Sequence, residues 1–509
     1  MNKIVVFLLI VQAAIIAVNS KEFHSKKLAP EGTVRQSKVQ YKKTDNLRLS
    51  LEQDGGLHEF YESEFSTRVD HFRPLNQQRV NFTYNANTHH FQNYGPIYIY
   101  LKDAYDYSTV FIEEGLMVDI AEQTGAALFT FDHRYFGRNR PRPSASLEDL
   151  EFLSMEQSLA DIAVFIRAIR NEIPTALFSR VILWGSGAGG TLAAFARSRY
   201  PHLVHAAWSS SAIIESAVYS WGPYDVFAFT FDINDGGVCR NLIEEAYVEI
   251  ATLVLSGRGE ELSERLNLCH PVQTDNPLDV ASLYEVSVRA VMAYFNVFHY
   301  QGVLDFCEDM EAIPGEPLAS LARWFRYVYG DAVCFDPSYD TAIERYSNPE
   351  WDQEGTNNGR RQWYFAQCTQ VGSFLVADNY TWLAGTVDIA YHLQKCEDLF
   401  GTPFPYERIT NAFYTLRDEF SQRISNIVYT NGNLDPIRYL GRLYDPTYTG
   451  VVINIDFASK SADLTSISDD EPDSITDAKE RIIDLITEWS LDEPPTEPPV
   501  SPTPETDTA

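Results

Sequence analysis

Basic residues are scarce in this sequence. Its 509 residues include 40 Lys and Arg against 71 Asp and Glu, which gives a formal net charge of −31. Nucleic-acid binding depends on clusters of Lys and Arg that contact phosphates, so a protein this acidic is poorly suited to bind DNA or RNA. Hydrophobic residues are not scarce, at 45% of the chain, and this content excludes a mostly disordered protein.

Long hydrophobic runs are also absent, except at the N-terminus. There a lysine precedes an apolar run over residues 4–18, and the small residues Val18 and Ser20 come just before Lys21. This pattern is typical of a secretory signal peptide at residues 1–20 that is cleaved before Lys21. A membrane anchor is the alternative, but the run is shorter than the ~20 residues that a membrane-spanning helix needs. We therefore expect a secretory-pathway protein without a membrane span.

The sequence contains no Cys-x-x-Cys pair, so a zinc site is not expected, and nothing else indicates a metal or cofactor. An even number of cysteines in an oxidising compartment predicts disulfides, but the sequence does not choose among the pairings. Two Asn-x-Thr sequons, at Asn81 and Asn379, predict N-glycosylation. The six cysteines all lie within one window: Cys239, Cys269, Cys307, Cys334, Cys368 and Cys396.

Strand-like and helical patterns alternate on both sides of this cysteine-containing window. Strand-like runs at residues 96–101, 126–131 and 181–184 are interleaved with a helical pattern at 155–171, and the alternation returns after Cys396. Such alternation predicts an α/β fold with a mostly parallel sheet. The expected division is a signal peptide at 1–20, a polar basic leader at 21–56, core segments at 57–212 and 397–490, a disulfide-bonded helical cap at 213–396, and a disordered Pro-rich tail at 491–509.

A glycine-rich turn follows the strand-like run at 181–184. Strand, glycine turn and helix suggest the Gly-x-Ser-x-Gly elbow that carries the nucleophile of many hydrolases. With Gly185 and Gly189 as the flanking glycines, the nucleophile position falls on Gly187, which has no side chain. Centring the motif on Ser186 instead would put the bulky Trp184 at a flank that must be small. Ser186 is therefore a weak alternative nucleophile.

Residues from about 64 to 489 resemble the family of serine exopeptidases that contains Pro-X carboxypeptidase, dipeptidyl peptidase II and thymus-specific serine protease. The resemblance implies an α/β-hydrolase fold with an inserted helical cap. It depends on an ordered set of short matches: Asp70-His71-Phe72, Gly95-Pro96-Ile97, His133-Arg134-Tyr135-Phe136-Gly137, the turn 185–190 followed by Leu192-Ala193-Ala194, Tyr200-Pro201, Ser209-Ser210-Ser211-Ala212, Trp363 with Cys368-Thr369, and Asn431-Gly432-Asn433-Leu434-Asp435-Pro436.

The same resemblance implies that most of the catalytic triad is lost. The family's triad acid falls on Asp435, which is retained, whereas its nucleophile falls on Gly187 and its histidine on Lys460. The family's Gly-Gly-Glu after the first core strand is replaced by Lys102-Asp103-Ala104. Gln370 stands where the family has a glutamate that can meet a substrate amine.

The histidine positions support this conclusion independently of the family. The triad of an α/β-hydrolase runs Ser, Asp, His along the chain, but the last of the eleven histidines is His392, which precedes Asp435. We interpret His133 as a structural hydrogen-bonding residue, Lys460 as a solvated loop lysine and Asp435 as a turn residue. Loss of the nucleophile or the histidine alone costs about 10⁶-fold in kcat in a well-studied serine protease.

The favoured hypothesis is thus an inactive, peptidase-like protein, secreted or lysosomal, that binds proline-containing peptides or a secreted protein partner. Homodimerisation and pairing with an active paralogue both stay open. The first alternative is an active serine exopeptidase, of the dipeptidyl-peptidase or Pro-X carboxypeptidase type, that uses Ser186. The second alternative is a structural secreted glycoprotein.

Overall fold

The computed structural model describes residues 60–491, with gaps at 216, 233–236, 331–332, 378–381, 384, 421–424 and 445–449. The predicted signal peptide, leader and Pro-rich tail, and the sequon at Asn379, therefore lie outside the described residues. None of the helices within the described ranges is long and apolar enough to cross a membrane.

An eight-stranded sheet forms the centre of the molecule, in the order β1-β2-β4-β3-β5-β6-β9-β10. β1 and β2 pair antiparallel with each other, β2 pairs antiparallel with β4, and all later neighbours are parallel. The strands are β1 (Phe60–Arg68), β2 (Arg79–Asn87), β3 (Ile97–Leu101), β4 (Ala127–Phe131), β5 (Val181–Ser186), β6 (Ala206–Ser210), β9 (Ile427–Gly432) and β10 (Gly450–Ile455).

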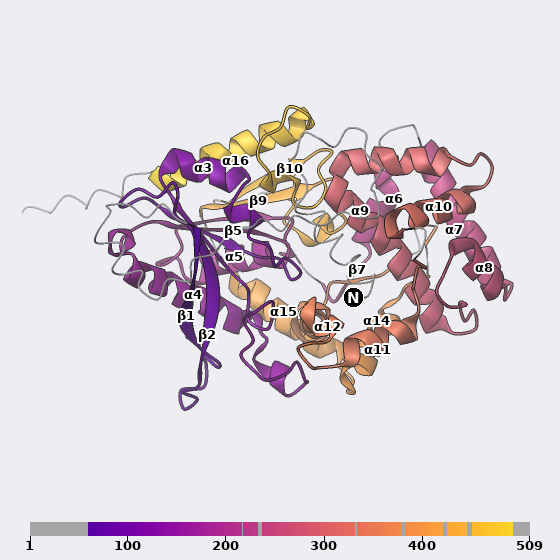
Figure 1. The fold of residues 1–509 in the computed structure, drawn as a ribbon, viewed down its shortest axis with the longest axis horizontal. Helices are drawn as coiled ribbons and strands as arrows, with labels where there is room; N and C mark the ends of the chain where they lie inside the picture. Colours follow the sequence, from indigo (N-terminus) through magenta and orange to yellow (C-terminus); the bar gives the residue numbers. More distant parts are fainter. Residues whose placement is uncertain are drawn as a thin grey trace, which may run out of the picture.

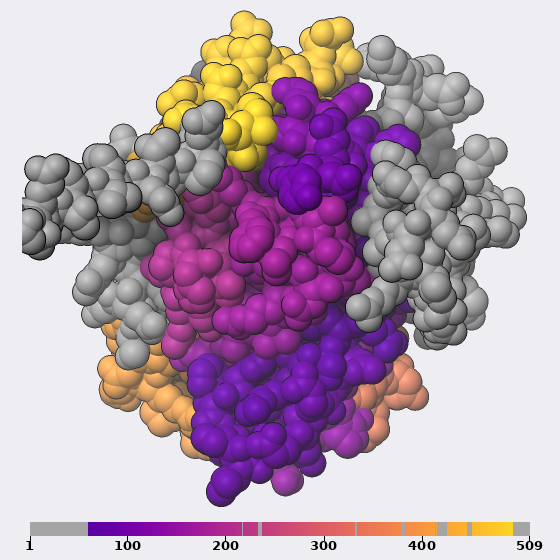
Figure 2. Space-filling model, turned by 90° about the vertical axis from the view of Figure 1, so that its left-hand side faces the viewer, coloured from indigo at the N-terminus to yellow at the C-terminus, as the bar shows by residue number. Residues whose placement is uncertain are grey.

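Helices cover both faces of this sheet (Figure 1), which explains why β3 and β4 are buried at every residue. Ile99 and Leu101 face α4 and α5, whereas Tyr98 and Tyr100 face α3 and α16. The C-terminal α16 lies beside the early α3, as the yellow and purple surfaces in Figure 2 show. The covering helices are α3 (Leu116–Thr124), α4 (Met155–Glu172), α5 (Ala188–Arg199) and α16 (Asp473–Leu491).

The chain leaves the sheet after β6 and builds a helical cap with its own aromatic core before it returns through α15 (Tyr406–Phe420) to β9 (Figure 1). The cap also contains a short parallel pair, β7 (Tyr219–Ser220) and β8 (Phe374–Leu375), which the helical pattern did not predict. Its helices are α6 (Gly222–Thr230), α7 (Val238–Leu255), α8 (Gly259–Leu266), α9 (Pro277–Glu311), α10 (Pro317–Tyr329), α11 (Tyr339–Ser347), α12 (Glu354–Asn357), α13 (Arg360–Ala366) and α14 (Ile389–Phe400).

Short helical turns connect several of these elements. One of them, the π-helical turn η4 (Gln367–Val371), follows α13 directly and lines the site described below. The others are the 3₁₀ turns η1 (Val110–Ile112), η2 (Asp149–Phe152), η3 (Pro174–Ala176), η5 (Arg438–Leu440) and η6 (Ala462–Leu464).

The strand order, the parallel centre of the sheet and the tight connection from β5 to α5 make this an α/β-hydrolase fold with a cap inserted between β6 and β9. The predicted fold class is therefore confirmed. The predicted element boundaries differ by a few residues. α5 begins at Ala188, not Thr191, because the turn before it is shorter than the glycine run, and α16 begins five residues before the predicted Ala478.

Three disulfides join all six cysteines: Cys239–Cys307, Cys269–Cys334 and Cys368–Cys396. The first joins α7 to α9 within the buried aromatic core of the cap, and the last joins η4 to α14. Two of the bridges close loops of 68 and 65 residues. Loops of this size restrict the unfolded chain strongly, so each bridge stabilises the cap.

We predict that the Cys269→Ser, Cys334→Ser double variant loses about 2–4 kcal/mol in free energy of unfolding, because removing this bridge frees a long loop in the unfolded chain. Denaturant titration followed by tryptophan fluorescence measures this loss. Alkylation of the denatured, unreduced wild-type protein should label no cysteine. Labelling of two or more thiols, or a variant as stable as wild type, would contradict the prediction.

Candidate active site

The connection between β5 and α5 turns sharply at Gly187. Its φ of 56° and ψ of −124° define a backbone conformation that residues with side chains rarely adopt. The flanking glycines are required by close packing. A Cβ atom at Gly185 would lie 2.4 Å from the carbonyl oxygen of Leu101, and one at Gly189 would lie 1.9 Å from it. The structure thus centres the elbow on Gly187, in the frame that the flanking glycines indicated.

The carboxylate of Asp103 occupies the space beside Gly187 that a nucleophile's side chain would fill. A Cβ atom at Gly187 would lie 2.5 Å from Oδ1 of Asp103 and 2.6 Å from its Cγ. Oδ1 accepts hydrogen bonds from the backbone N–H groups of Ala188, at 2.9 Å, and Ala104, at 2.8 Å. Asp103 therefore both fills the elbow and accepts from the first N–H of α5.

Lys460 pairs with this carboxylate, because its Nζ lies 2.5 Å from Oδ2 of Asp103. The two side chains are only 25% and 20% exposed, so the interpretation of Lys460 as a solvated loop lysine was wrong. A lysine on a loop looks solvated in the sequence, and only the fold brings it to a carboxylate in the distant loop that follows β3. Asp103 is the site residue that sequence reasoning missed. The replaced Gly-Gly-Glu motif at 102–104 marked the segment but not the contact.

The ion pair sets the charge of both partners. Burial raises the pKa of Asp103, but Lys460 and the two backbone N–H donors outweigh that effect and hold the pKa below its usual value. Burial lowers the pKa of Lys460, and the Asp103 carboxylate more than reverses this, so the pKa lies above its usual value. Lys460 is therefore protonated at neutral pH and has no lone pair to accept a proton.

Asp435 follows β9 and is fully buried. Its Oδ1 accepts a hydrogen bond from the backbone N–H of Ile437 at 3.0 Å, which is a turn interaction. Its Oδ2 has no hydrogen-bond partner among the described residues. Burial raises the pKa of this carboxyl group to about 6, although the N–H of Ile437, the charge of Lys460 and the hydroxyl of Ser211 oppose the shift. The retained acid thus holds no imidazole.

Ser186 points into the protein interior. Ser186 is only 3% exposed, and its Oγ is hydrogen-bonded to Oγ of Ser461. Ser461 lies directly after Lys460, and its backbone N–H donates to Oγ of Ser211 at 3.1 Å. Ser186 is therefore part of a buried hydroxyl network that supports the loop carrying Lys460.

A cap histidine that sequence reasoning did not single out also reaches this loop. Nδ1 of His299, in α9, lies 2.5 Å from Oγ of Ser459, the residue before Lys460. The backbone of His299 has a positive φ of 52° and interrupts the regular helix. Burial lowers the pKa of His299 to about 4, so its ring is neutral at physiological pH. His299 thus ties the cap to the loop that positions Lys460.

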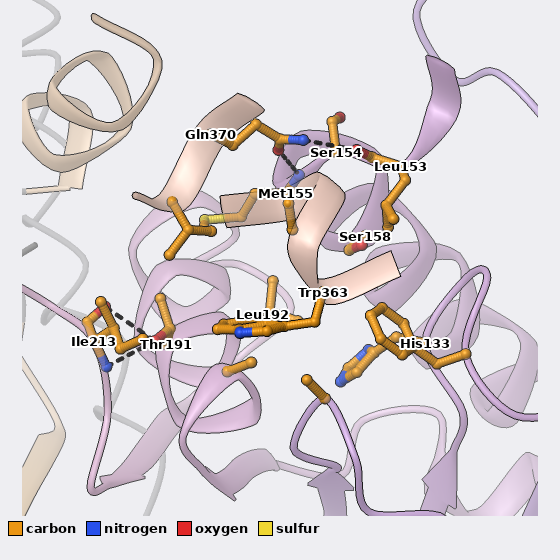
Figure 3. Close-up of a pocket in the computed structure, with 15 residues that line it drawn as sticks. His133, Leu153, Ser154, Met155, Ser158, Thr191, Leu192, Ile213, Trp363 and Gln370 are labelled. Carbon is orange, nitrogen blue, oxygen red and sulfur yellow. Dashed lines mark hydrogen bonds between the residues drawn. The ribbon is translucent and has the colours of Figure 1, made fainter. Parts of the chain in front are cut away.

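An apolar pocket opens beside the elbow, between the core and η4 of the cap, and Figure 3 shows its lining side chains. It encloses about 660 Å³ of empty space, including its open mouth. Its wall includes Ala104 and Ala188, the neighbours of Asp103 and Gly187. The remaining lining residues are His133, Phe136, Leu153, Ser154, Met155, Ser158, Thr191, Leu192, Ile213, Trp363, Ala366, Gln370 and Val371.

Two polar side chains of the pocket lining, His133 and Gln370, both bond to the backbone. Nε2 of His133 donates to the carbonyl oxygen of Lys102 at 2.9 Å, which agrees with a structural role. The amide of Gln370 accepts from the N–H of Met155 at 2.9 Å and donates to the carbonyl oxygen of Leu153 at 2.7 Å (Figure 3). Gln370 therefore fixes the start of α4 and carries no charge to meet a substrate amine.

Within the parts of the chain that the structure describes, no group of three or more His, Cys, Asp or Glu side chains is arranged to hold a metal ion.

Known proteins with similar sequences are serine peptidases. Residues 67–482 match the model of the family described as Serine carboxypeptidase S28. Lysosomal Pro-X carboxypeptidase of Mus musculus is 27% identical over 453 residues, which cover 84% of this chain and 89% of that protein. A putative serine protease of Caenorhabditis elegans is 24% identical, covering 84% and 88%. Thymus-specific serine protease of Mus musculus is 24% identical, covering 73% and 76%.

The raised pKa of Asp435 predicts a specific dependence of stability on pH. Below about pH 4 this carboxyl is protonated in both the folded and unfolded states. As the pH rises toward 6, the unfolded state loses the proton before the folded state does, so folding stability falls; above about pH 6 the difference is constant. The stability of Asp435→Asn relative to wild type should therefore increase between pH 4 and 6, by about 1–3 kcal/mol.

Urea denaturation of wild type and Asp435→Asn at several pH values between 4 and 7 measures this difference. The matched control is Asp469→Asn, which removes an exposed aspartate of the same chain. A difference between Asp435→Asn and wild type that stays flat with pH would show that Asp435 is already ionised at pH 4.

Proposed function

The chain belongs to the serine carboxypeptidase S28 family, and we propose that it is an inactive member that binds peptides in its inherited cleft. The observation that carries the proposal is the position of Asp103. Its carboxylate fills the nucleophile's place beside Gly187 and is neutralised by Lys460, which stands at the family's histidine position. The site therefore holds an ion pair where the family's chemistry needs a hydroxyl and an imidazole.

Asp103 also opposes the stabilisation of an oxyanion. In this fold the N–H after the nucleophile is one of the donors that stabilise the negative oxygen of the tetrahedral intermediate. Here that N–H, on Ala188, already donates to the Asp103 carboxylate. A developing oxyanion would have to displace the Asp103 carboxylate from this N–H and would then lie beside its negative charge. Asp103 therefore disfavours both nucleophilic attack at the elbow and the development of negative charge on the substrate oxygen.

The pocket is the reason to propose binding instead of a purely structural role. It remains open and apolar beside the elbow, although none of its lining side chains is positioned for hydrolysis. A proline ring, which is compact and apolar, matches such a lining, with Trp363 and Phe136 as aromatic contacts. Larger ligands could present a proline-containing segment to the same pocket. They are a secreted protein partner, a second copy of this chain or an active paralogue.

Active-site use of Ser186 has less support. Its hydroxyl is buried and bonded to Ser461, and its strand position precedes the tip of the elbow by one residue. Lys460, the neighbour of Ser461 in the chain, pairs with Asp103 and cannot act as a general base while it is protonated.

We predict that the wild-type protein is not labelled by a fluorophosphonate probe and does not cleave Pro-X or X-Pro peptides, and that Ser186→Ala changes neither result. The double variant Gly187→Ser, Lys460→His should also not be labelled by the probe, because the serine Cβ would lie 2.5 Å from the Asp103 carboxylate. Adding Asp103→Gly removes that contact and frees the Ala188 N–H. Only this triple variant should gain measurable labelling.

In-gel fluorescence of probe-treated protein, with thermal denaturation to confirm folding of each variant, measures the outcome. The Gly187→Ala variant combined with Lys460→His and Asp103→Gly is the matched control, since it lacks only the hydroxyl. If wild type is labelled and Ser186→Ala abolishes the labelling, the inactive assignment fails and Ser186 is the nucleophile.

Peptide binding is tested separately by isothermal titration calorimetry with N-acetyl-Ala-Pro-Phe. Saturable binding that Trp363→Ala weakens supports the peptide-binding proposal. Absence of binding by short proline-containing peptides would favour the structural-glycoprotein alternative.

We also propose a secreted or lysosomal location, as the names of the lysosomal Pro-X carboxypeptidase relatives and the N-terminal pattern suggest. Asn81 agrees with this proposal because it lies exposed on β2. Protein secreted from cultured cells should begin at or near Lys21 and should lose mass on treatment with N-glycosidase. An intact Met1, or an unchanged mass, would contradict this.

A further inference from the structure

A group of arginines lies where the C-terminal half of α4, the loop before β5 and the end of α16 meet. Arg167 and Arg170 stand three residues apart on α4, so their side chains lie on one face of that helix. Nη2 of Arg170 donates to the carbonyl oxygen of Ser179 at 2.9 Å. Nη1 of the next residue, Arg180, donates to the carbonyl oxygen of Trp489 at 2.9 Å. These contacts connect the three arginines to the last turn of α16.

The positive charge of these arginines is not balanced within the described part of the chain. Each of the three donates to a backbone carbonyl oxygen, and none forms an ion pair with a described carboxylate. Glu172, two residues after Arg170, accepts instead from the hydroxyl of Tyr84 at 2.6 Å. Burial lowers the pKa of Arg170, and the charge of Arg167 lowers it further, so the two cations repel each other. An acidic ligand would relieve this repulsion.

Apolar surface and unpaired polar atoms adjoin the arginines. Phe178 is 90% exposed and Leu177 is 46% exposed. Nε of Arg170 and Oγ of Ser179 are buried, yet they have no hydrogen-bond partner among the described residues. Because buried polar groups in proteins are normally hydrogen-bonded, these two atoms indicate that a further group with acceptors covers them. We define the basic patch as Arg167, Arg170, Leu177, Phe178 and Arg180.

The segment that follows α16 has a composition complementary to the basic patch. Residues 492–509 contain six prolines, five acidic residues and no Lys or Arg. Asp492 comes three residues after Trp489, so it lies at most ~11 Å along the chain from the contact with Arg180. Proline-rich chains favour the extended polyproline II conformation, at ~3 Å per residue, so they bind across a surface with little loss of conformational entropy. The acidic residues are Asp492, Glu493, Glu497, Glu505 and Asp507.

The end of α16 also requires positive charge nearby. Its last turn contains no basic residue, and Asp492 and Glu493 follow it directly. Carboxylates at the C-terminus of a helix are repelled by the negative end of the helix dipole. Arg180, which donates to the carbonyl oxygen of Trp489 in that turn, supplies a cation that offsets this repulsion. The start of the acidic segment therefore adjoins the basic patch.

We propose that the acidic, proline-rich segment 492–509 docks on the basic patch of its own chain. Its carboxylates pair with the arginines, and its proline rings cover Phe178 and Leu177. The basic patch lies at the opposite end of α4 from Met155 and Ser158, which line the apolar pocket. This docking is thus independent of the proposed peptide binding, and either can fail without the other.

Fluorescence anisotropy of the full-length protein tests this docking. A dye is attached to the segment through Ser501→Cys, since none of the native cysteines is free. At low salt the docked segment should give a high anisotropy. The anisotropy should fall in about 1 M NaCl, where the Debye length is only ~3 Å and the charges are screened. At low salt it should not depend on protein concentration, because the contact is intramolecular.

Two sets of changes should release the segment at low salt. One is Arg167→Glu with Phe178→Ser, which alters two exposed residues of the basic patch and should leave the fold intact. The other is Asp492→Asn, Glu493→Gln and Glu497→Gln, which removes negative charge from the segment alone. Each set should abolish most of the salt-dependent part of the anisotropy. Because the second set leaves the core unchanged, misfolding of the core cannot account for its effect.

The matched control is Arg326→Glu with Leu255→Ser, which makes the same kinds of change on α10 and α7 of the cap (Figure 1). This variant should keep the wild-type anisotropy. Low anisotropy of the wild-type protein at low salt, or high anisotropy that survives both sets of changes, overturns the docking. Anisotropy that rises with protein concentration also overturns it, and assigns the segment to a second copy of the chain.

Discussion

The ion pair between Lys460 and Asp103 is the interaction on which the state of the whole site depends. It fills the space beside Gly187, uses the first N–H of α5 and holds the loop at 459–461 against the elbow. With less than a third of each side chain exposed, the pair is shielded from water and must remain intact, because removing either partner would leave a largely buried charge.

The surroundings of the pair are arranged to support it. Ser186 and Ser211 form hydrogen bonds with Ser461, and His299 of the cap forms one with Ser459. The flanking glycines allow the close approach of β3 to α5 that brings Asp103 to Gly187. A serine introduced at position 187 alone would therefore place its Cβ atom against the Asp103 carboxylate.

Core and cap contribute different chemistry to the cleft. The core supplies the elbow and much of the apolar pocket wall, and its sheet is rigid because both faces are covered. The cap supplies Trp363 and Val371, and its disulfides join helices that are distant in the chain. A peptide lying in the pocket would contact both, because core and cap side chains line it together.

The sequence by itself determined the fold class, because strand and helix periodicities and the glycine turn are local patterns that tertiary contacts reinforce. It also determined that Gly187 carries no nucleophile and that no histidine follows Asp435, since both are facts of residue identity and order. Only the tertiary structure decided which cysteines pair, and that Lys460 meets Asp103 across 357 residues of chain. Long-range contacts of this kind leave no periodicity in the sequence, because they depend on how distant segments pack.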